Sequence, residues 1–318
     1  MSIQSSISSV SLAAGLLLLA DVRTIAYHTT IQGTSSFLDI FFLAPGIHQQ
    51  QHAPEVSRGE YPATGAMTTG YVFRTENEAT VYYLQRVGKT GHLVTIEVLP
   101  SAPNSAPSSR DTLVRMLRMA GVAFTVAVIL RLYHLRDWWA VGCMTALMTA
   151  RLLNVIVIKR RSKLGWKGAA EPGVQGDLLV LLSQDRWLRM QGLVDDLKTV
   201  TSGSWLREES TAESFLVTIG TLLVYASPAV AMNASPVGGS LILCVILVSL
   251  ALLGLCNALA DTQKMFGRTL RTVGEPKKYR RRLDLVEELV KVHGRDDWAI
   301  GMGMVTVADR EKMQKATM

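Results

Sequence analysis

The hydrophobic pattern of the chain centres on one stretch, Ser240 to Ala260 (SLILCVILVSLALLGLCNALA), which contains no charged side chain. As an α-helix it would extend about 30 Å, the thickness of a bilayer's hydrocarbon core. A buried helix of a soluble protein usually keeps a polar edge, whereas this stretch has only two serines, two cysteines and Asn257. The pattern predicts a transmembrane helix.

A pair of hydrophobic segments lies earlier in the chain. Residues 112–135 have an apolar centre, MAGVAFTVAVIL, with arginines near both ends whose long side chains can reach the headgroups. Near the start of residues 137–158 lie Trp138 and Trp139, where an interfacial aromatic belt is expected. The basic run KRR follows residue 158. The pattern predicts a transmembrane hairpin over 112–158.

The most apolar stretch has a partner of its own. Residues 213–232 are apolar and contain Pro228, which removes a backbone hydrogen bond and predicts a kink. A short loop, NASPVGG, connects the two segments. Residues 213–260 therefore predict a second transmembrane hairpin, between a polar loop at 159–212 and a tail at 261–318.

The N-terminal residues 1–30 are open to two interpretations. Their apolar core, Val10 to Ala20, has the length of a signal-peptide core, but no lysine or arginine precedes it and the residues before Asp21 form a poor cleavage site. The alternative is a retained hydrophobic helix that spans the membrane or lies at its interface, with Asp21 and Arg23 buried or directed toward the headgroups. We expect the retained helix.

Residues 31–111 are mostly polar. Within them, residues 71–99 (YVFR, TVYYLQRV and HLVTIEV) are rich in β-branched and aromatic side chains and predict a three-stranded meander, followed by a Pro/Ser linker. The alternative takes Thr75 and Glu78 as a capping box that opens a helix ending at Gly88.

The polar loop 159–212 predicts a β-hairpin, DLLVLLS and RWLRMQG, closed by Gln184-Asp185. A short helix is then expected in VDDLKTVTSGSW. The alternative is a single amphipathic helix over residues 178–200.

The tail 261–318 is strongly basic, with thirteen Lys/Arg against eight Asp/Glu from residue 263 onward. Residues 283–293 predict an amphipathic helix that stops at Gly294, and GMGMVTV predicts a strand. Basic side chains beside a span are attracted to anionic lipids of the cytoplasmic leaflet. We expect such contacts from eight of them: Lys264, Arg268, Arg271, Lys277, Lys278, Arg280, Arg281 and Arg282.

Composition and charge agree with a membrane protein that also carries polar segments: 48% of residues are hydrophobic, 19% are charged and the net charge is +7. The positive-inside rule places the basic segments on both sides of 213–260 in the cytoplasm. Residues 71–99, the polar loop and the tail helix then share one side, and each is too small to bury a core alone. We expect a multi-pass, mainly α-helical membrane fold, with two transmembrane hairpins and a small α+β cytoplasmic part.

Four polar residues lie in or at the ends of the predicted spans: Arg151, Asn154, Asn257 and Asp261. An ionisable group inside a membrane is costly and by default marks function, such as a site for an anionic lipid or substrate. Arg151 and Asn154 share a helical face, and Asn257 or Asp261 could pair with Arg151 across the bundle. The alternative is that Arg151 extends toward the headgroups beside Lys159.

The sequence contains no GxSxG, Walker or HExxH motif. His48 and His52 have a spacing that binds metal on a helix, but Pro54 opposes a helix and no third ligand is evident, so no metal is expected. The three cysteines fall within predicted spans, which argues against a disulfide framework. We expect no cofactor and no nucleic-acid partner, because the positive charge lies beside the spans.

The stretch Gly176 to Leu206, GDLLVLLSQDRWLRMQGLVDDLKTVTSGSWL, together with its flanking spans, resembles a group of uncharacterised polytopic integral membrane proteins of filamentous fungi. The resemblance covers residues 110–310. It carries no motif tied to a reaction, so it implies membrane location and polytopic architecture only.

These features together favour a non-catalytic role, as a scaffold, regulator or accessory subunit with a basic cytoplasmic face. Its expected partners are the lipid bilayer, anionic lipid headgroups and a protein on the cytoplasmic side. The alternative is a membrane-embedded enzyme that acts on a lipid or isoprenoid-like substrate through polar groups such as Arg151 and Asn257. The sequence does not indicate the organelle.

Overall fold

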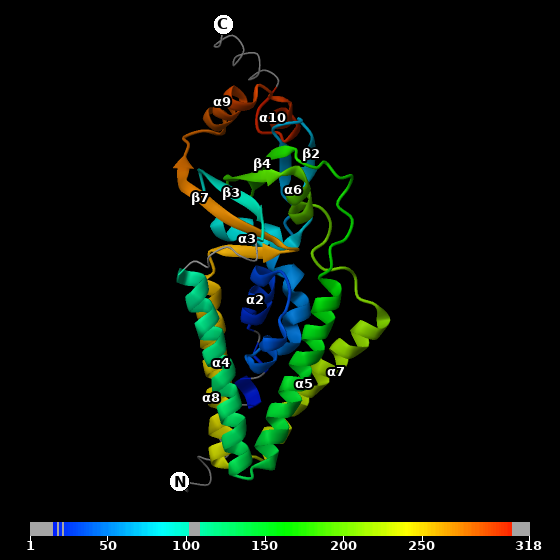
Figure 1. The fold of residues 1–318 in the computed structure, drawn as a ribbon, viewed down its shortest axis with the longest axis vertical. Helices are drawn as coiled ribbons and strands as arrows, with labels where there is room; N and C mark the ends of the chain where they lie inside the picture. Colours follow the sequence, from blue (N-terminus) through cyan, green and yellow to red (C-terminus); the bar gives the residue numbers. More distant parts are fainter. Residues whose placement is uncertain (1–14, 18, 21, 102–108, 307–318) are drawn as a thin grey trace. The chain divides into compact units, whose positions relative to one another are not determined.

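The computed structural model describes residues 15–17, 19–20, 22–101 and 109–306. The chain forms two compact units, drawn in Figure 1, whose segments alternate along the sequence. The helical unit comprises residues 1–54, 105–163 and 206–260. The sheet unit comprises residues 55–104, 164–205 and 261–318.

Four helices of the helical unit are long and apolar enough to cross a membrane: α4 (Ser109–His134), α5 (Trp138–Arg161), α7 (Thr211–Ala231) and α8 (Pro236–Leu259). They coincide closely with the four hydrophobic segments predicted after residue 111. Serine side chains cap two of them, because Ser210 accepts the N–H of Glu213 and Ser235 accepts the N–H of Gly238.

The four helices pack most closely as two pairs, α5 against α7 and α4 against α8. Figure 1 shows the two pairs diverging from the end where short turns join α4 to α5 and α7 to α8. The shared core includes Leu147 of α5, Val224 of α7 and Ile242 of α8, all buried. The closest packing therefore joins helices that belong to different predicted hairpins.

An N-terminal segment fills the space between the two helix pairs. It contains α2 (Thr24–Gln32) and two 3-10 helices, η1 (Phe37–Phe41) and η2 (Ile47–Ser57). Phe42 and Leu43, which follow η1, are fully buried in the core. The helix predicted over residues 1–30 falls largely outside the described residues, and its described end is α2.

The sheet unit contains one seven-stranded mixed sheet in the order β2-β1-β4-β5-β3-β7-β6. The strands β3 and β5 run parallel, and every other neighbouring pair is antiparallel. Segments far apart in the sequence thus combine into one α+β unit, as expected from their individual sizes. The strands are β1 (Ala63–Ala66), β2 (Val72–Arg74), β3 (His92–Pro100), β4 (Gln175–Leu182), β5 (Arg186–Leu193), β6 (Thr262–Met265) and β7 (Arg268–Lys278).

Helices lie on both faces of the sheet. On one face, Leu179 of β4 and Trp187 of β5 pack against α9 (Arg282–His293) and α10 (Asp297–Gly301). On the other face lies α6 (Val194–Thr201), whose Leu197 side chain approaches Gly176 of β4. Adjacent strand residues point to opposite faces, so Gly176 and Leu179 belong to different layers.

Local sequence explains several of these elements. The predicted hairpin of the polar loop is confirmed as β4–β5, and Gln184 and Asp185 at its turn both have positive φ, 64° and 53°. This strand pairing excludes the alternative of one long helix. The predicted tail helix is confirmed as α9, and it ends at Gly294, whose φ of 69° is the left-handed conformation that glycine tolerates.

Two predictions about the sheet unit are wrong. Residues 71–99 are not a meander, because α3 (Glu78–Val87) separates β2 from β3. The alternative helix ending at Gly88 is correct, although the capping side chain is Asn77, which accepts the N–H of Thr80. The segment GMGMVTV is not a strand in its described part, since the end of α10 and turns occupy it. The side chains of α3 have high β propensity, but the N-cap at Asn77 favours a helix, and the helix prevails.

Asp137 joins the two turns at one end of the helical unit. Its carboxylate accepts the N–H of Ala140 at 3.0 Å, which caps α5, and the N–H of Ser235 at 2.8 Å, from the turn before α8. Burial raises the pKa of Asp137, but the hydrogen bonds from Ser235 and Ala140 lower it and prevail. The pKa of this carboxyl therefore lies below its ordinary value.

We predict that Asp137→Asn lowers the free energy of unfolding by about 1–2 kcal/mol at neutral pH, because the amide can replace only one of the two acceptor oxygens. A depressed folded pKa stabilises the fold above the ordinary pKa, and that contribution is lost as the pH falls through the folded pKa. The difference between wild type and variant should therefore shrink in acid. Thermal unfolding in detergent at several pH values measures it, with Glu275→Gln on exposed β7 as the control. Equal midpoints at neutral pH would contradict this role.

Candidate functional site

The candidate site in the helical unit is a buried polar network around Arg151. The guanidinium of Arg151 is fully buried. It donates from Nε to the backbone carbonyl of Asp39 at 3.2 Å and from Nη1 to Oε1 of Gln50 at 2.8 Å. Arg151 therefore does not extend toward the end of α5, and both of its acceptors come from the N-terminal segment.

Asp39 of η1 is the carboxylate at the centre of this network. Its Oδ1 accepts from Nη2 of Arg118 on α4 at 2.6 Å, and its Oδ2 accepts the N–H of Ser36 at 2.8 Å. The Nε2 atom of His28 lies 4.0 Å from Oδ1. Removing Arg118 would leave the buried Asp39 carboxylate without its nearest counterion.

The two asparagines predicted as site residues both contact the N-terminal segment. Asn154 donates to the carbonyl of Ala150 at 2.9 Å and accepts from Nε2 of Gln51 at 3.1 Å. Asn257 accepts from Nδ1 of His28 at 2.9 Å and donates to the carbonyl of Thr24 at 2.9 Å. They tie α5 to η2 and α8 to α2.

The predicted pairing of Arg151 with Asn257 or Asp261 is wrong, because the acceptors of Arg151 are Asp39 and Gln50. Asp261 belongs to the sheet unit, where its backbone carbonyl accepts from the hydroxyl of Tyr83 at 3.0 Å. The structure thus brings Arg151, Asn154 and Asn257 to one segment of the chain and leaves Asp261 in the other unit.

Other polar side chains of the apolar helices bind the backbone of the same segment. Thr125 of α4 donates to the carbonyl of Phe41 at 2.8 Å, and Ser249 of α8 accepts the N–H of Leu43 at 3.2 Å. Backbone groups outside a helix or sheet must find such partners when they are buried. The polar positions on α4, α5 and α8 therefore supply hydrogen bonds that the irregular chain cannot make for itself.

Sequence reasoning did not identify Asp39, Gln50 or His28, although they complete the network. The available signal was the single acidic residue in the apolar run FLDIFFL. Burial of these residues follows from the insertion of their segment between the helix pairs, which local patterns do not indicate.

The network carries an excess of positive charge. Arg118 pairs with the Asp39 carboxylate, whereas Arg151 bonds only the backbone carbonyl of Asp39, so two arginines and one carboxylate leave a net charge of +1 with His28 neutral. Within this network, three buried donor or acceptor atoms have no hydrogen-bond partner among the described residues: Arg118 Nε, Arg151 Nη2 and His28 Nε2.

The eight basic residues predicted to contact anionic lipids fall into two groups. Four form ion pairs within the sheet unit: Arg268 with Asp196 at 2.5 Å, Arg271 with Glu97 at 2.7 Å, Lys277 with Glu288 at 2.6 Å and Arg282 with Asp185 at 2.5 Å. The hydrogen bond from Lys277 lowers the pKa of Glu288. The other four are exposed and pair with no carboxylate among the described residues: Lys264, Lys278, Arg280 and Arg281.

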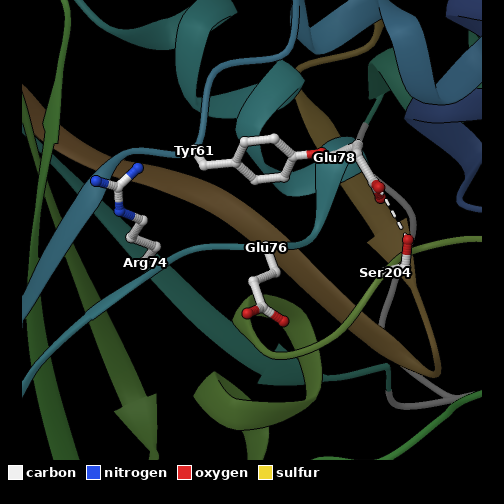
Figure 2. A pocket seen from close by; sticks show the side chains of 5 residues that line it. All are labelled: Tyr61, Arg74, Glu76, Glu78 and Ser204. Carbon is white, nitrogen blue, oxygen red and sulfur yellow. Dashed lines mark hydrogen bonds between the residues drawn. The ribbon is translucent and has the colours of Figure 1, made fainter.

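An open hollow of about 360 Å³ lies on the sheet unit (Figure 2). Figure 2 shows the Tyr61 ring between Arg74 and Glu78 in this view, with Glu76 below. The Glu78 carboxylate accepts from Ser204 Oγ at 2.9 Å and also from the N–H of Trp205 at 2.9 Å. Its acceptor capacity is thus largely used in holding residues 204–205 against the start of α3.

A second hollow, of about 450 Å³, lies where the sheet face that carries α9 is only partly covered. Val94, Ile96 and Val98 of β3 are buried on the opposite face, whereas Thr95 and Glu97 are partly exposed. The hollow is lined by side chains of neighbouring strands, among them Glu97, Leu99, Gln175, Gln191 and Val273.

Among the residues that the structure describes, no group of three or more His, Cys, Asp or Glu side chains could hold a metal ion. His48 lies beside an aromatic ring instead, with its centroid 5.3 Å from that of Tyr225. No protein-family model matches the chain, and comparisons with curated proteins and with solved structures likewise gave no significant match.

We predict that Arg118→Met destabilises the helical unit by about 3–5 kcal/mol, because it leaves the buried Asp39 carboxylate without its counterion. The double variant Arg118→Met with Asp39→Asn should recover most of this loss, since no uncompensated carboxylate remains. Thermal unfolding in detergent measures both effects. Arg115→Met, one turn earlier on α4 and exposed, is the matched control. A double variant no more stable than Arg118→Met would contradict the pairing.

Proposed function

We propose that this chain is a multi-pass membrane protein with a non-catalytic role, as a scaffold, regulator or accessory subunit. In this proposal α4–α5 and α7–α8 are two transmembrane hairpins, and the sheet unit lies on the cytoplasmic side. The length and apolar character of the four helices support the membrane location. The open face of the sheet unit is the observation that carries the binding role.

The connectivity of the chain supports one side for the whole sheet unit. Besides the junction after Pro54, its segments join the helical unit at the start of α4, the end of α5, the start of α7 and the end of α8. Short turns reverse the chain at the opposite ends of these helices, so the four junctions belong to the same side of a bilayer. The basic run at residues 159–163 lies at one of them, which favours the cytoplasm.

The polar network supports a structural role for the ionisable groups between the helices. The hydrogen bonds of Arg151, Asn154 and Asn257 go to the chain's own N-terminal segment or to their own helix. Groups of this kind can hold irregular backbone inside a membrane without acting on a substrate. This use favours the anchoring role over the alternative of a membrane-embedded enzyme.

Binding by the sheet unit is supported by its partly uncovered face. Val273 is 44% exposed there, beside Glu97 and Gln191, in a hollow that a partner's side chain can enter. Anionic headgroups are the second proposed partner. Exposed basic residues without a carboxylate partner, such as Arg280 and Arg281, attract an anionic leaflet by about 1 kcal/mol each when they lie near it.

We predict that the four junctions and the sheet unit are accessible from one side of the membrane only. Single cysteines at Lys163 and Lys278, in a background with the three native cysteines replaced by alanine, should react alike with an impermeant maleimide in sealed vesicles. A cysteine at Asn233, in the turn before α8, should show the opposite accessibility. Equal labelling at all three positions would contradict the two-hairpin topology.

We predict that the partly uncovered sheet face contacts a protein partner. A photo-crosslinking amino acid at Val273 should give discrete adducts in native membranes, because the hollow is a preformed surface. The matched control is Val292 on α9, also an exposed valine, at 62%. Adducts that are absent at Val273, or identical at both positions, would contradict binding at this face.

A further inference from the structure

A small surface of the helical unit combines exposed apolar side chains with two cations. It consists of Phe37 and Leu38 of η1, Arg118 of α4 and Lys159 of α5, and is called the Phe37 surface. Phe37 is 56% exposed and Leu38 is 41% exposed. Asp39, the next residue, is buried, so η1 is apolar outward and acidic inward.

The two cations flank these apolar side chains. The Nζ atom of Lys159 lies 5.0 Å from the centre of the Phe37 ring, and Arg118 Nη2 lies 2.6 Å from Asp39 Oδ1. Both cations therefore approach the same three residues of η1, which a 3-10 helix spaces by about 2 Å each along its axis.

The position of the two cations in their helices places them at a bilayer boundary. Lys159 directly follows the apolar run of α5, and Arg118 directly precedes the apolar centre of α4. The turn at residues 135–137 makes these two helices antiparallel, so both boundaries lie at the same end. Phosphate groups of lipids lie at this level, with the acyl chains beside the apolar part of the helices.

Charge decides which headgroup fits. Lys159, Arg118 and Arg151 contribute three positive charges and Asp39 contributes one negative charge, which leaves +2 around η1. Lys159 is exposed and forms no ion pair among the described residues. The Arg118 side chain is partly exposed, although its Nε atom is buried. A zwitterionic headgroup has no net charge to complement this field, whereas an anionic headgroup has a net negative charge that does.

We propose that the Phe37 surface binds the headgroup of an anionic phospholipid. The phosphate lies between Lys159 and Arg118, and the exposed Phe37 and Leu38 side chains contact the upper part of the acyl chains. Binding would tie η1, and through Asp39 the buried network, to the leaflet that surrounds it. The site rests on the proposed membrane location, but is independent of any protein bound by the sheet unit.

The test compares the full chain in nanodiscs of phosphatidylcholine alone and in an equimolar mixture with phosphatidylserine. Native mass spectrometry counts retained lipids, and thermal unfolding reports stabilisation. Wild type should retain phosphatidylserine preferentially and unfold at a higher temperature in the mixture. The variant Lys159→Gln with Phe37→Ser should bind phosphatidylserine about fivefold more weakly, the effect of one cation near an anionic surface.

The controls distinguish binding at the Phe37 surface from binding elsewhere on the chain and from a loss of folding. Lys89→Gln with Lys291→Gln removes two exposed cations of the sheet unit that the proposed function does not place at the membrane, and should leave the retained lipid unchanged. Unchanged unfolding of the Lys159 and Phe37 variant in phosphatidylcholine alone would show that the variant folds. An equal loss in both double variants, no preference in wild type, or the same stabilisation by inorganic phosphate in phosphatidylcholine would overturn the proposal. None of these results depends on the maleimide or photo-crosslinking experiments.

Discussion

The helical unit depends on one constraint: an irregular stretch of backbone is buried between apolar helices and needs hydrogen-bond partners. Arg151, Thr125 and Ser249 supply them to residues 39–43, each from a different helix. A buried carbonyl or N–H without a partner costs about 1–3 kcal/mol. The hydrogen bonds to these backbone groups therefore explain the polar side chains on the apolar helices. The same contacts fix the N-terminal segment between the helix pairs.

The charged residues of the buried network lie next to a charged residue on the surface of the helical unit. Asp39 compensates Arg118 directly and Arg151 partly, while Lys159 and Phe37 lie at the outer edge of the same 3-10 helix. The buried network and the outer surface therefore share η1 as a common element. A charge bound outside would act on the same group of residues that holds the irregular segment inside, which gives the helical unit a physical connection between its surroundings and its core.

The sheet unit shows how three segments, each too small to fold alone, form a stable layer structure. Strands β3 and β5 pair in parallel although residues 101–185, which include α4 and α5, separate them in the sequence, and β7 adds to the far side of β3. The ion pairs of β7 with Glu97 and Glu288 occur within this assembly. Part of the basic tail therefore forms ion pairs within the fold, whereas Lys264, Lys278, Arg280 and Arg281 are exposed.

The sequence alone determined the elements whose signals are local. These are the four apolar helices, the β4–β5 hairpin with its Gln184-Asp185 turn, and α9 with its glycine stop, because length, alternation and turn chemistry are properties of neighbouring residues. Only the tertiary structure decided that β3 pairs with β5 and β7, and that Arg151 meets Asp39 and Gln50. Such pairings depend on long-range burial: the cost of an unsatisfied polar group is set by what surrounds it, and no local pattern records those surroundings.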